Sequence, residues 1–87
     1  MENRENDGMM RIALVGVIVK DREEVEKLNG LLHEYREYII GRMGVPYKEK
    51  DISIISVAMN APQDKISALS GKIGMIKGIS SKVIYAP

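Results

Sequence analysis

An apolar segment near the N-terminus, Arg11–Val19, constrains the fold more than any other feature of this chain. It reads RIALVGVIV, and both of its alternating sets of residues are apolar. A strand with one face in water would alternate apolar with polar residues, whereas a strand covered on both faces need not. Most of its residues are β-branched, which favours a strand over a helix. The segment therefore predicts a central β-strand.

Two segments have the spacing of amphipathic helices. Asp21, with Glu24 three residues later, matches the capping-box pattern that starts many helices. It predicts a first helix over Arg22–Arg36, in which the apolar residues at helical intervals are Val25, Leu28, Leu32 and Tyr35. Pro62 is well placed at the start of a second helix, because its missing N–H is not needed there. Gly78 is a natural stop for that helix, whose apolar positions are Ile66, Leu69, Ile73 and Ile76.

Three further segments have the composition of strands. Tyr38–Val45 contains two glycines, which predicts a short, bent or bulged strand at an edge of the sheet, and we expect Pro46 to stop it. Ile52–Met59 predicts another strand, ended by the Asn-Ala-Pro sequence that follows. Ile79–Tyr85 has serine and lysine residues that would face water, as is typical of an edge strand.

The resulting order of elements is β-α-β-β-α-β. Two right-handed β-α-β crossovers place both helices on one face of a four-stranded antiparallel sheet, so the predicted fold class is an α+β, ferredoxin-like sandwich. We expect residues 1–9 to form a flexible N-terminal tail and residues 10–87 to form a single domain. The other face of the sheet would be bare and apolar, and a domain of 87 residues gains stability from association. We therefore expect a homo-oligomer, either a dimer or a tetramer. The alternative is a central strand that is only locally hydrophobic.

Charge and cysteine content exclude several classes of function. The 13 basic and 12 acidic residues are interspersed and give a net charge of +1, whereas a nucleic-acid-binding surface needs a basic stripe. The absence of cysteine removes disulfides, thiolate metal sites and cysteine nucleophiles. No apolar stretch is long enough to span a bilayer, and the charged N-terminus lacks the apolar centre of a secretory signal. We expect a cytoplasmic protein that contacts neither a membrane nor nucleic acid directly.

The segment Gly41–Tyr47, GRMGVPY, is the candidate binding site. It places two glycines, a proline and an arginine between a helical and a strand pattern, where an ordinary connection needs only a few polar residues. Small neighbours would let a ligand approach the backbone, and the Arg42 guanidinium would grip a carboxylate or phosphate at two points. We expect a small anionic metabolite as ligand. The candidate ligand-binding residues are Gly41, Arg42, Met43, Gly44 and Tyr47.

The alternative interpretation of this segment is structural. Arg42 would form a surface ion pair while the two glycines serve a β-bulge. Its acidic partner would be Glu37, Glu49 or Asp51.

The sequence argues against a metal site and against catalysis. His33 and Glu37 would share a face of the first helix, but a lone histidine more often forms a hydrogen bond than a metal site. Acylphosphatases share the predicted fold and bind phosphate in a glycine-rich turn after the first strand. The corresponding turn here, Lys20–Glu23, has two acidic residues and no glycine, so it would repel an anion. We expect no metal, no cofactor and no enzymatic activity.

The chain resembles the iron-only hydrogenase system regulators, a family that looks like ACT-type regulatory domains and like the C-terminal domain of the nickel-responsive repressor. The segments that carry the resemblance are Ile12–Arg22, Leu31–Tyr35, Gly41–Tyr47, Ile52–Val57 and Ile66–Gly74. They are specific in combination and cover nearly everything from Arg11 onward. The resemblance implies a homo-oligomeric, ACT-like domain that senses a small ligand or binds a protein partner, in a regulatory role. The alternative is a structural oligomeric adaptor with no ligand.

Two features of the nickel-responsive repressor do not carry over. Such a repressor needs a DNA-binding ribbon-helix-helix ahead of this domain, and only about ten residues precede the first predicted strand. Its nickel site depends on several histidines and a cysteine, whereas this chain has one histidine and no cysteine. The resemblance therefore implies a regulator that acts without its own DNA-binding module and without nickel.

Overall fold

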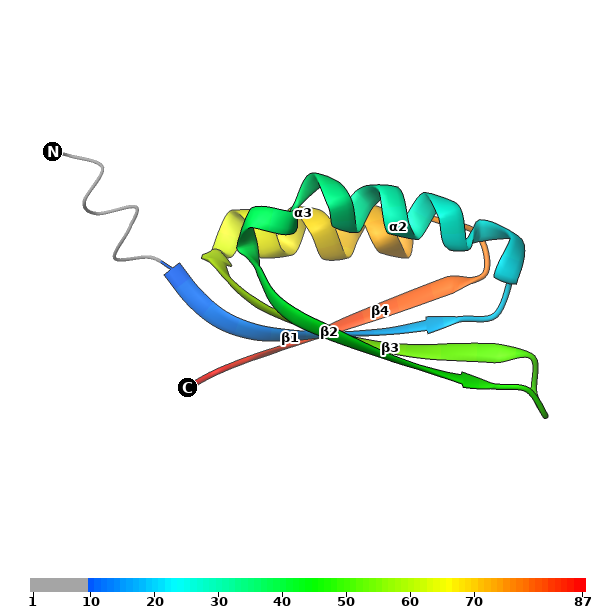
Figure 1. The fold of residues 1–87 in the computed structure, drawn as a ribbon. Helices are drawn as coiled ribbons and strands as arrows, with labels where there is room; N and C mark the ends of the chain where they lie inside the picture. Colours follow the sequence, from blue (N-terminus) through cyan, green and yellow to red (C-terminus); the bar gives the residue numbers. More distant parts are fainter. Residues whose placement is uncertain (1–9) are drawn as a thin grey trace, which may run out of the picture.

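The computed structural model describes residues 10–87, and its elements follow the predicted β-α-β-β-α-β order. They are β1 (Met10–Val19), the 3-10 turn η1 (Arg22–Glu24), α2 (Val25–Glu34), the 3-10 turn η2 (Arg36–Tyr38), β2 (Ile39–Tyr47), β3 (Ile52–Pro62), α3 (Gln63–Gly74) and β4 (Ile79–Tyr85). The strands form one antiparallel sheet in the order β2-β3-β1-β4. Both helices lie on the same face of this sheet (Figure 1). The predicted α+β, ferredoxin-like fold is thus confirmed, while the predicted tail lies outside the described residues.

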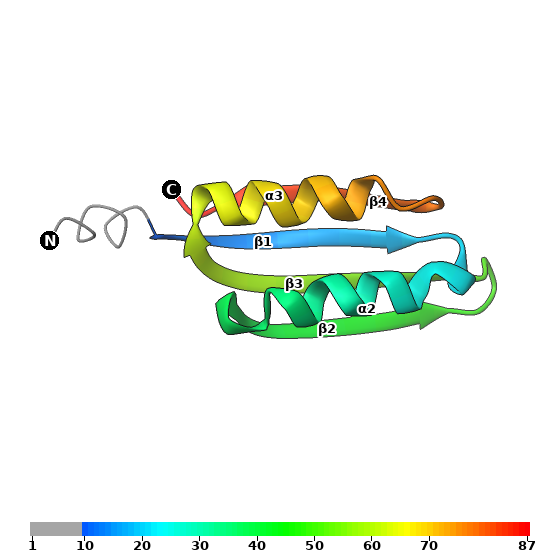
Figure 2. The same cartoon turned by 90° about the horizontal axis from the view of Figure 1, so that it is seen from above.

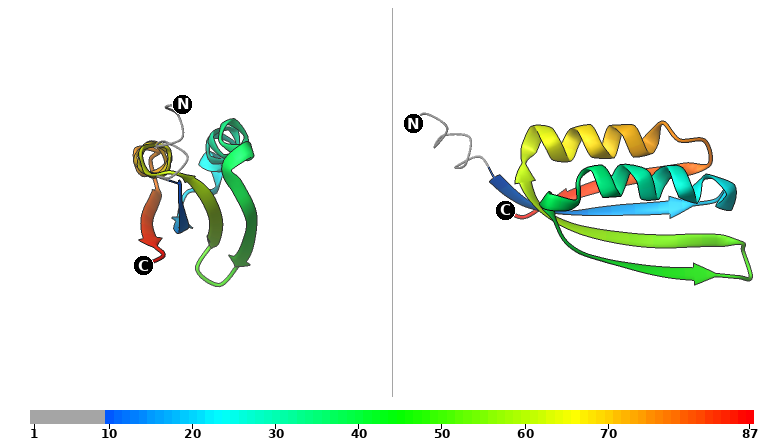
Figure 3. Two further views of the ribbon diagram at one scale, coloured as in Figure 1. Left: turned by 90° about the vertical axis from the view of Figure 1, so that its left-hand side faces the viewer. Right: turned by 45° about the horizontal axis from the view of Figure 1, so that its top comes forward.

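β1 is the central strand that its sequence predicts, with β3 on one side and β4 on the other. Its alternate residues from Ala13 to Val19 face the helices and are at most 2% exposed. The intervening apolar side chains point the opposite way, and Ile12 is 49% exposed while Leu14 and Ile18 are each 42% exposed. Residues 10–87 therefore cover only one face of the sheet, as the end-on view in Figure 3 shows.

The core lies between the sheet and the two helices. Seen from above, α3 covers the side of the sheet that holds β1 and β4, and α2 covers the side that holds β3 and β2 (Figure 2). Each helix contributes one apolar stripe, because residues three or four apart share a helix face. The fully or almost fully buried helix residues are Leu28 and Leu32 on α2 and Ile66, Leu69 and Ile73 on α3.

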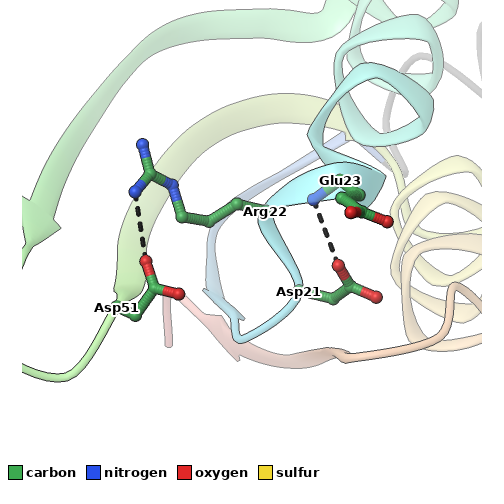
Figure 4. Close-up of polar contacts among 4 residues, drawn as sticks. All are labelled: Asp21, Arg22, Glu23 and Asp51. Atoms are coloured by element: carbon green, nitrogen blue, oxygen red, sulfur yellow. Dashed lines mark hydrogen bonds and ion pairs between the residues drawn. The ribbon is translucent and has the colours of Figure 1, made fainter.

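The first helix is shorter than its sequence pattern predicts. The chain forms η1 first and becomes α-helical only over Val25–Glu34. Asp21 caps this start, since its carboxylate accepts a hydrogen bond of 3.1 Å from the Glu23 N–H (Figure 4). The Glu24 carboxylate lies 3.0 Å from Lys27 Nζ, so it pairs along the helix rather than closing the predicted capping box.

β2 is longer than predicted, because Pro46 does not stop it. The strand runs to Tyr47, and Pro46 is in register with Ser53 of β3. An edge strand has a neighbour on one side only, so it tolerates a residue without an N–H. The predicted edge position is confirmed, and so is the bulge, which shifts the register between Ile39 and Gly41.

Gly78 has a different role from the helix stop that its position suggests. α3 already ends at Gly74, and Gly78 lies in the connection to β4 with a φ angle of +76°. Its carbonyl accepts a hydrogen bond of 2.7 Å from the Lys20 N–H. A Cβ atom at this position would stand 2.5 Å from the Asp21 Cβ atom. Gly78 therefore holds two connections together at one end of the sheet.

The structure also bears on membrane insertion. Among residues 10–87, no helix is long and apolar enough to cross a bilayer.

Candidate functional site

The five candidate ligand-binding residues do not converge on one site, because they all lie on β2. Successive side chains of a strand point to opposite faces of the sheet. Arg42 and Gly44 pair with Val57 and Ile55, which are buried on the helix side. The other three, Gly41, Met43 and Tyr47, pair with Ala58, Ser56 and Ile52 on the opposite set of β3 positions. β2 therefore contributes to two separate surfaces.

The first surface is a cleft on the helix side, called here the α2–β2 cleft. It has a volume of about 300 Å³ and is lined by Asn29, Leu32, His33, Arg36, Ile39 and Arg42. The Arg42 Nη2 atom donates a hydrogen bond of 3.2 Å to the Asn29 carboxamide oxygen. The Arg36 Nη1 atom donates one of 2.9 Å to the backbone carbonyl of His33. Arginine, asparagine and histidine side chains thus line one small surface cleft.

The residues that α2 and η2 add to this cleft are absent from the site predicted on β2. Their spacing in the sequence could have indicated them. Asn29, His33 and Arg36 are four and three residues apart, so they lie on one face of the α2 region. Only the placement of this helix over β2 brings that face to Arg42.

The alternative structural role for Arg42 is a surface ion pair with an acidic residue. Asp51, in the turn between β2 and β3, forms its ion pair with Arg22 of η1 at 3.1 Å, with both side chains largely exposed (Figure 4). The Glu49 carboxylate accepts a hydrogen bond from the Tyr47 hydroxyl. Arg42 instead contacts Asn29, and among the described residues it forms no ion pair with Glu37, Glu49 or Asp51.

The contact between Tyr47 and Glu49 changes the acidity of the phenol. Because a carboxylate acceptor stabilises the protonated hydroxyl, it raises the pKa of Tyr47 above its ordinary value of 10.0, with a smaller contribution from desolvation. Glu49→Gln should therefore lower the pKa of Tyr47 toward that value. An NMR pH titration of the tyrosine rings measures this pKa, and Glu23→Gln on η1 is the control that should leave it unchanged. An equal Tyr47 pKa in the wild type and Glu49→Gln would contradict the expectation.

The second surface is the sheet face without helices, called here the open face. β1, β2, β3 and β4 all contribute exposed apolar side chains to it. These are Ile12, Leu14, Ile18, Met43, Val45, Tyr47, Ile54 and Ile84. The largest exposed fractions are those of Met43 and Ile84, each 67%.

The open face is hollowed where small residues replace large ones. One hollow of about 380 Å³ has Gly16 among its lining residues, together with Ile18, Ile54 and the polar Ser56 and Lys82. A second, of about 250 Å³, is lined in part by Leu14, Gly41 and Met43. Three of the candidate residues, Gly41, Arg42 and Met43, thus line this hollow, which lies on the opposite face from the α2–β2 cleft.

The glycines of β2 need no special backbone conformation. The positive φ angles among the described residues occur at Asp51 and Gly78, so Gly41 and Gly44 have φ angles that other residues adopt. A Cβ atom at Gly44 would come within ordinary contact distance of the Ile55 side chain, at 3.6 Å. The effect of these two glycines is therefore the absence of a side chain on the surface of β2, not a special backbone conformation.

Three comparisons place the chain among known proteins. Residues 11–83 match the TM1266-like family, described as "Iron-only hydrogenase system regulator, putative". The structure of the uncharacterized protein TM1266 from Thermotoga maritima has a TM-score of 0.85 and 35% identity, and the match covers 90% of this chain and 99% of that chain. The C-terminal domain of the MgtC protein from Mycobacterium tuberculosis has a TM-score of 0.71 at 12% identity, covering 90% of this chain and 89% of that domain. At that identity, the second likeness shows a common fold only.

A curated relative is longer than this chain. The "Putative nickel-responsive regulator" of Saccharolobus solfataricus is 30% identical over 78 residues, which are 90% of this chain and 57% of the relative. The chain therefore spans a little over half the length of that relative. Both the family and this relative have the names of regulators, not of enzymes. With the family match extending over residues 11–83, the chain belongs to the TM1266-like family of iron-only hydrogenase system regulators.

Proposed function

We propose that this chain is a homo-oligomeric, ACT-like regulatory module of the iron-only hydrogenase system, in which a second copy covers the open face and a small ligand alters that contact. The open face is the observation that carries the proposal. Monomeric soluble proteins rarely expose a large contiguous apolar patch, and such patches commonly mark interfaces. Here all four strands contribute to one.

A second copy of the chain is the occupant that fits this face best. Two-fold association brings the same patch of each copy together, which suits a surface whose central strand is apolar. β1 supplies that centre through Ile12, Leu14 and Ile18. The two hollows give apolar side chains of the other copy a place to pack. Burying these residues would also add to the limited core of a small domain.

β2 supports a link between ligand binding and assembly. Arg42 lines the α2–β2 cleft, whereas its chain neighbour Met43 lies on the open face. A ligand that bound in the cleft and shifted β2 would therefore also shift side chains of the proposed interface. Such a ligand changes the assembly only by as much as its affinity differs between the two arrangements.

The proposal assigns no nickel and no direct contact with DNA to this chain. Nickel response is part of the name of the Saccharolobus relative, but this chain has a single histidine and no cysteine. Its basic residues are interspersed with acidic ones, so an effect on transcription would pass through a protein partner. An adaptor that assembles in the same way but binds no ligand is the competing function.

The assembly is tested by light scattering coupled to size exclusion. We expect a mass of twice 9.7 kDa, or a multiple of that dimer, throughout the micromolar range. A mass of one chain across the whole range would contradict the proposal.

A further inference from the structure

We infer that the α2–β2 cleft is a binding site for a compact anion with a carboxylate or phosphate group, gripped by Arg42 and Arg36 and oriented by Asn29. This site rests on the proposed function and deepens it, because it names the class of ligand and the place where it binds. It also adds two residues, Asn29 and Arg36, to those that the sequence of β2 predicts.

The hydrogen bonds within the cleft leave mainly donors available. The carboxamide oxygen of Asn29 already accepts from Arg42, so its NH₂ group is the part that can bind a ligand. The backbone carbonyl of His33 already accepts from Arg36. Each guanidinium has five N–H groups and uses one of them in these contacts. The cleft therefore offers donors to a ligand that supplies acceptors.

The charge of the cleft points to the same ligand. Two guanidinium groups line it, and none of the described residues that line it is acidic. Arginine pairs with carboxylate or phosphate through two parallel hydrogen bonds, which makes it suited to planar, two-point recognition. An anion would also relieve the repulsion between two cations that share one cleft.

The size and floor of the cleft restrict the ligand further. A volume of about 300 Å³ is at the low end for small-molecule sites, so the ligand is compact. Leu32 and Ile39 contribute apolar surface beside the polar groups. A short dicarboxylate or a small phosphate ester has the matching combination of charge and size.

An NMR titration of the whole chain tests this inference. The probes are inorganic phosphate in one arm and malonate in the other, each against sodium chloride at the same ionic strength. We expect saturable shifts of the signals of Asn29, Arg36 and Arg42 in at least one arm, and the arm that responds distinguishes phosphate from carboxylate. Unsaturable shifts equal to those in sodium chloride, or shifts confined to other surfaces, would overturn the inference.

Three variants separate specific recognition from loss of charge. Arg42→Gln and Arg36→Gln should each weaken binding about tenfold or more, because each removes charge-assisted hydrogen bonds. Arg22→Gln is the matched control, since it loses the same charge at an exposed site on η1 and should bind like the wild type. Equal weakening in all three variants would reduce the effect to general electrostatics and overturn the site.

The outcome is independent of the assembly test. If the protein is a monomer but phosphate or malonate binds in the cleft, the proposed interface fails and the anion site stands. If the protein is a dimer and neither probe binds, the anion site fails and the adaptor function is favoured.

Discussion

Replacing Gly78 with alanine will destabilise the fold by roughly 3 kcal/mol, the largest effect on stability that we expect of any single methyl group added to this chain. Two costs add together at this position. The φ angle of +76° is one that residues with a Cβ atom rarely adopt. The added Cβ atom would also stand 2.5 Å from the Asp21 Cβ atom, so the two connections at this end of the sheet would have to separate.

Gly71→Ala is the matched control for this prediction. Gly71 is exposed on α3, has no neighbouring atom within 4 Å of an added Cβ atom, and has an ordinary φ angle. Alanine in the interior of a helix is favoured over glycine, so this variant should gain up to about 1 kcal/mol. Urea unfolding followed by circular dichroism measures both changes. Equal midpoints for the two variants would show that the contact between Gly78 and Asp21 is not tight.

Replacing Leu14 with lysine is expected to convert the proposed oligomer into single chains. Leu14 lies near the centre of the open face, where its side chain is 42% exposed in one copy. In an isolated chain the lysine ammonium reaches water, so the fold should survive. In a two-fold assembly, two such charges would be buried without partners, which we expect to raise the dissociation constant at least about a hundredfold.

Ala68→Lys introduces the same charge on the exposed surface of α3, on the opposite side of the molecule, and should keep the wild-type mass. Sedimentation equilibrium measures the dissociation constant of both variants. An unchanged constant for Leu14→Lys would move the interface away from the open face.

Local patterns account for the parts of the fold that the sequence predicts correctly. Two local patterns identify these elements: the apolar run of β1, and the helical spacing of Leu28 and Leu32 and of Ile66 and Leu69. Each pattern belongs to one short segment and marks the side chains that the segment buries. The boundaries are less predictable, because they depend on tertiary contacts. Pro46 continues β2 since its strand lies at an edge, and the chain becomes α-helical only at Val25, after the 3-10 turn over Arg22–Glu24.

The candidate site is predictable only in part, for a similar reason. The composition of Gly41–Tyr47 singles the segment out but does not give its conformation, and a strand divides alternate residues between two faces. Arg42 and Met43 are adjacent in the sequence, but they pair with β3 residues on opposite faces of the sheet. The partners of Arg42 come from α2 and η2, and their approach depends on how the helix packs across the sheet.

The outer edge of β2 has a consequence for how large an assembly of this chain can grow. A strand edge normally invites another strand to add to it, and repeated addition produces fibres. β2 carries both a bulge beside Ile40 and a proline at position 46, two features that disturb the regular ladder an incoming strand would need. Addition of further strands along this edge is therefore disfavoured. If two copies pack through their open faces, as proposed, that contact buries both faces and leaves neither open to a third copy. The β2 edge would therefore not extend the proposed assembly into a fibre.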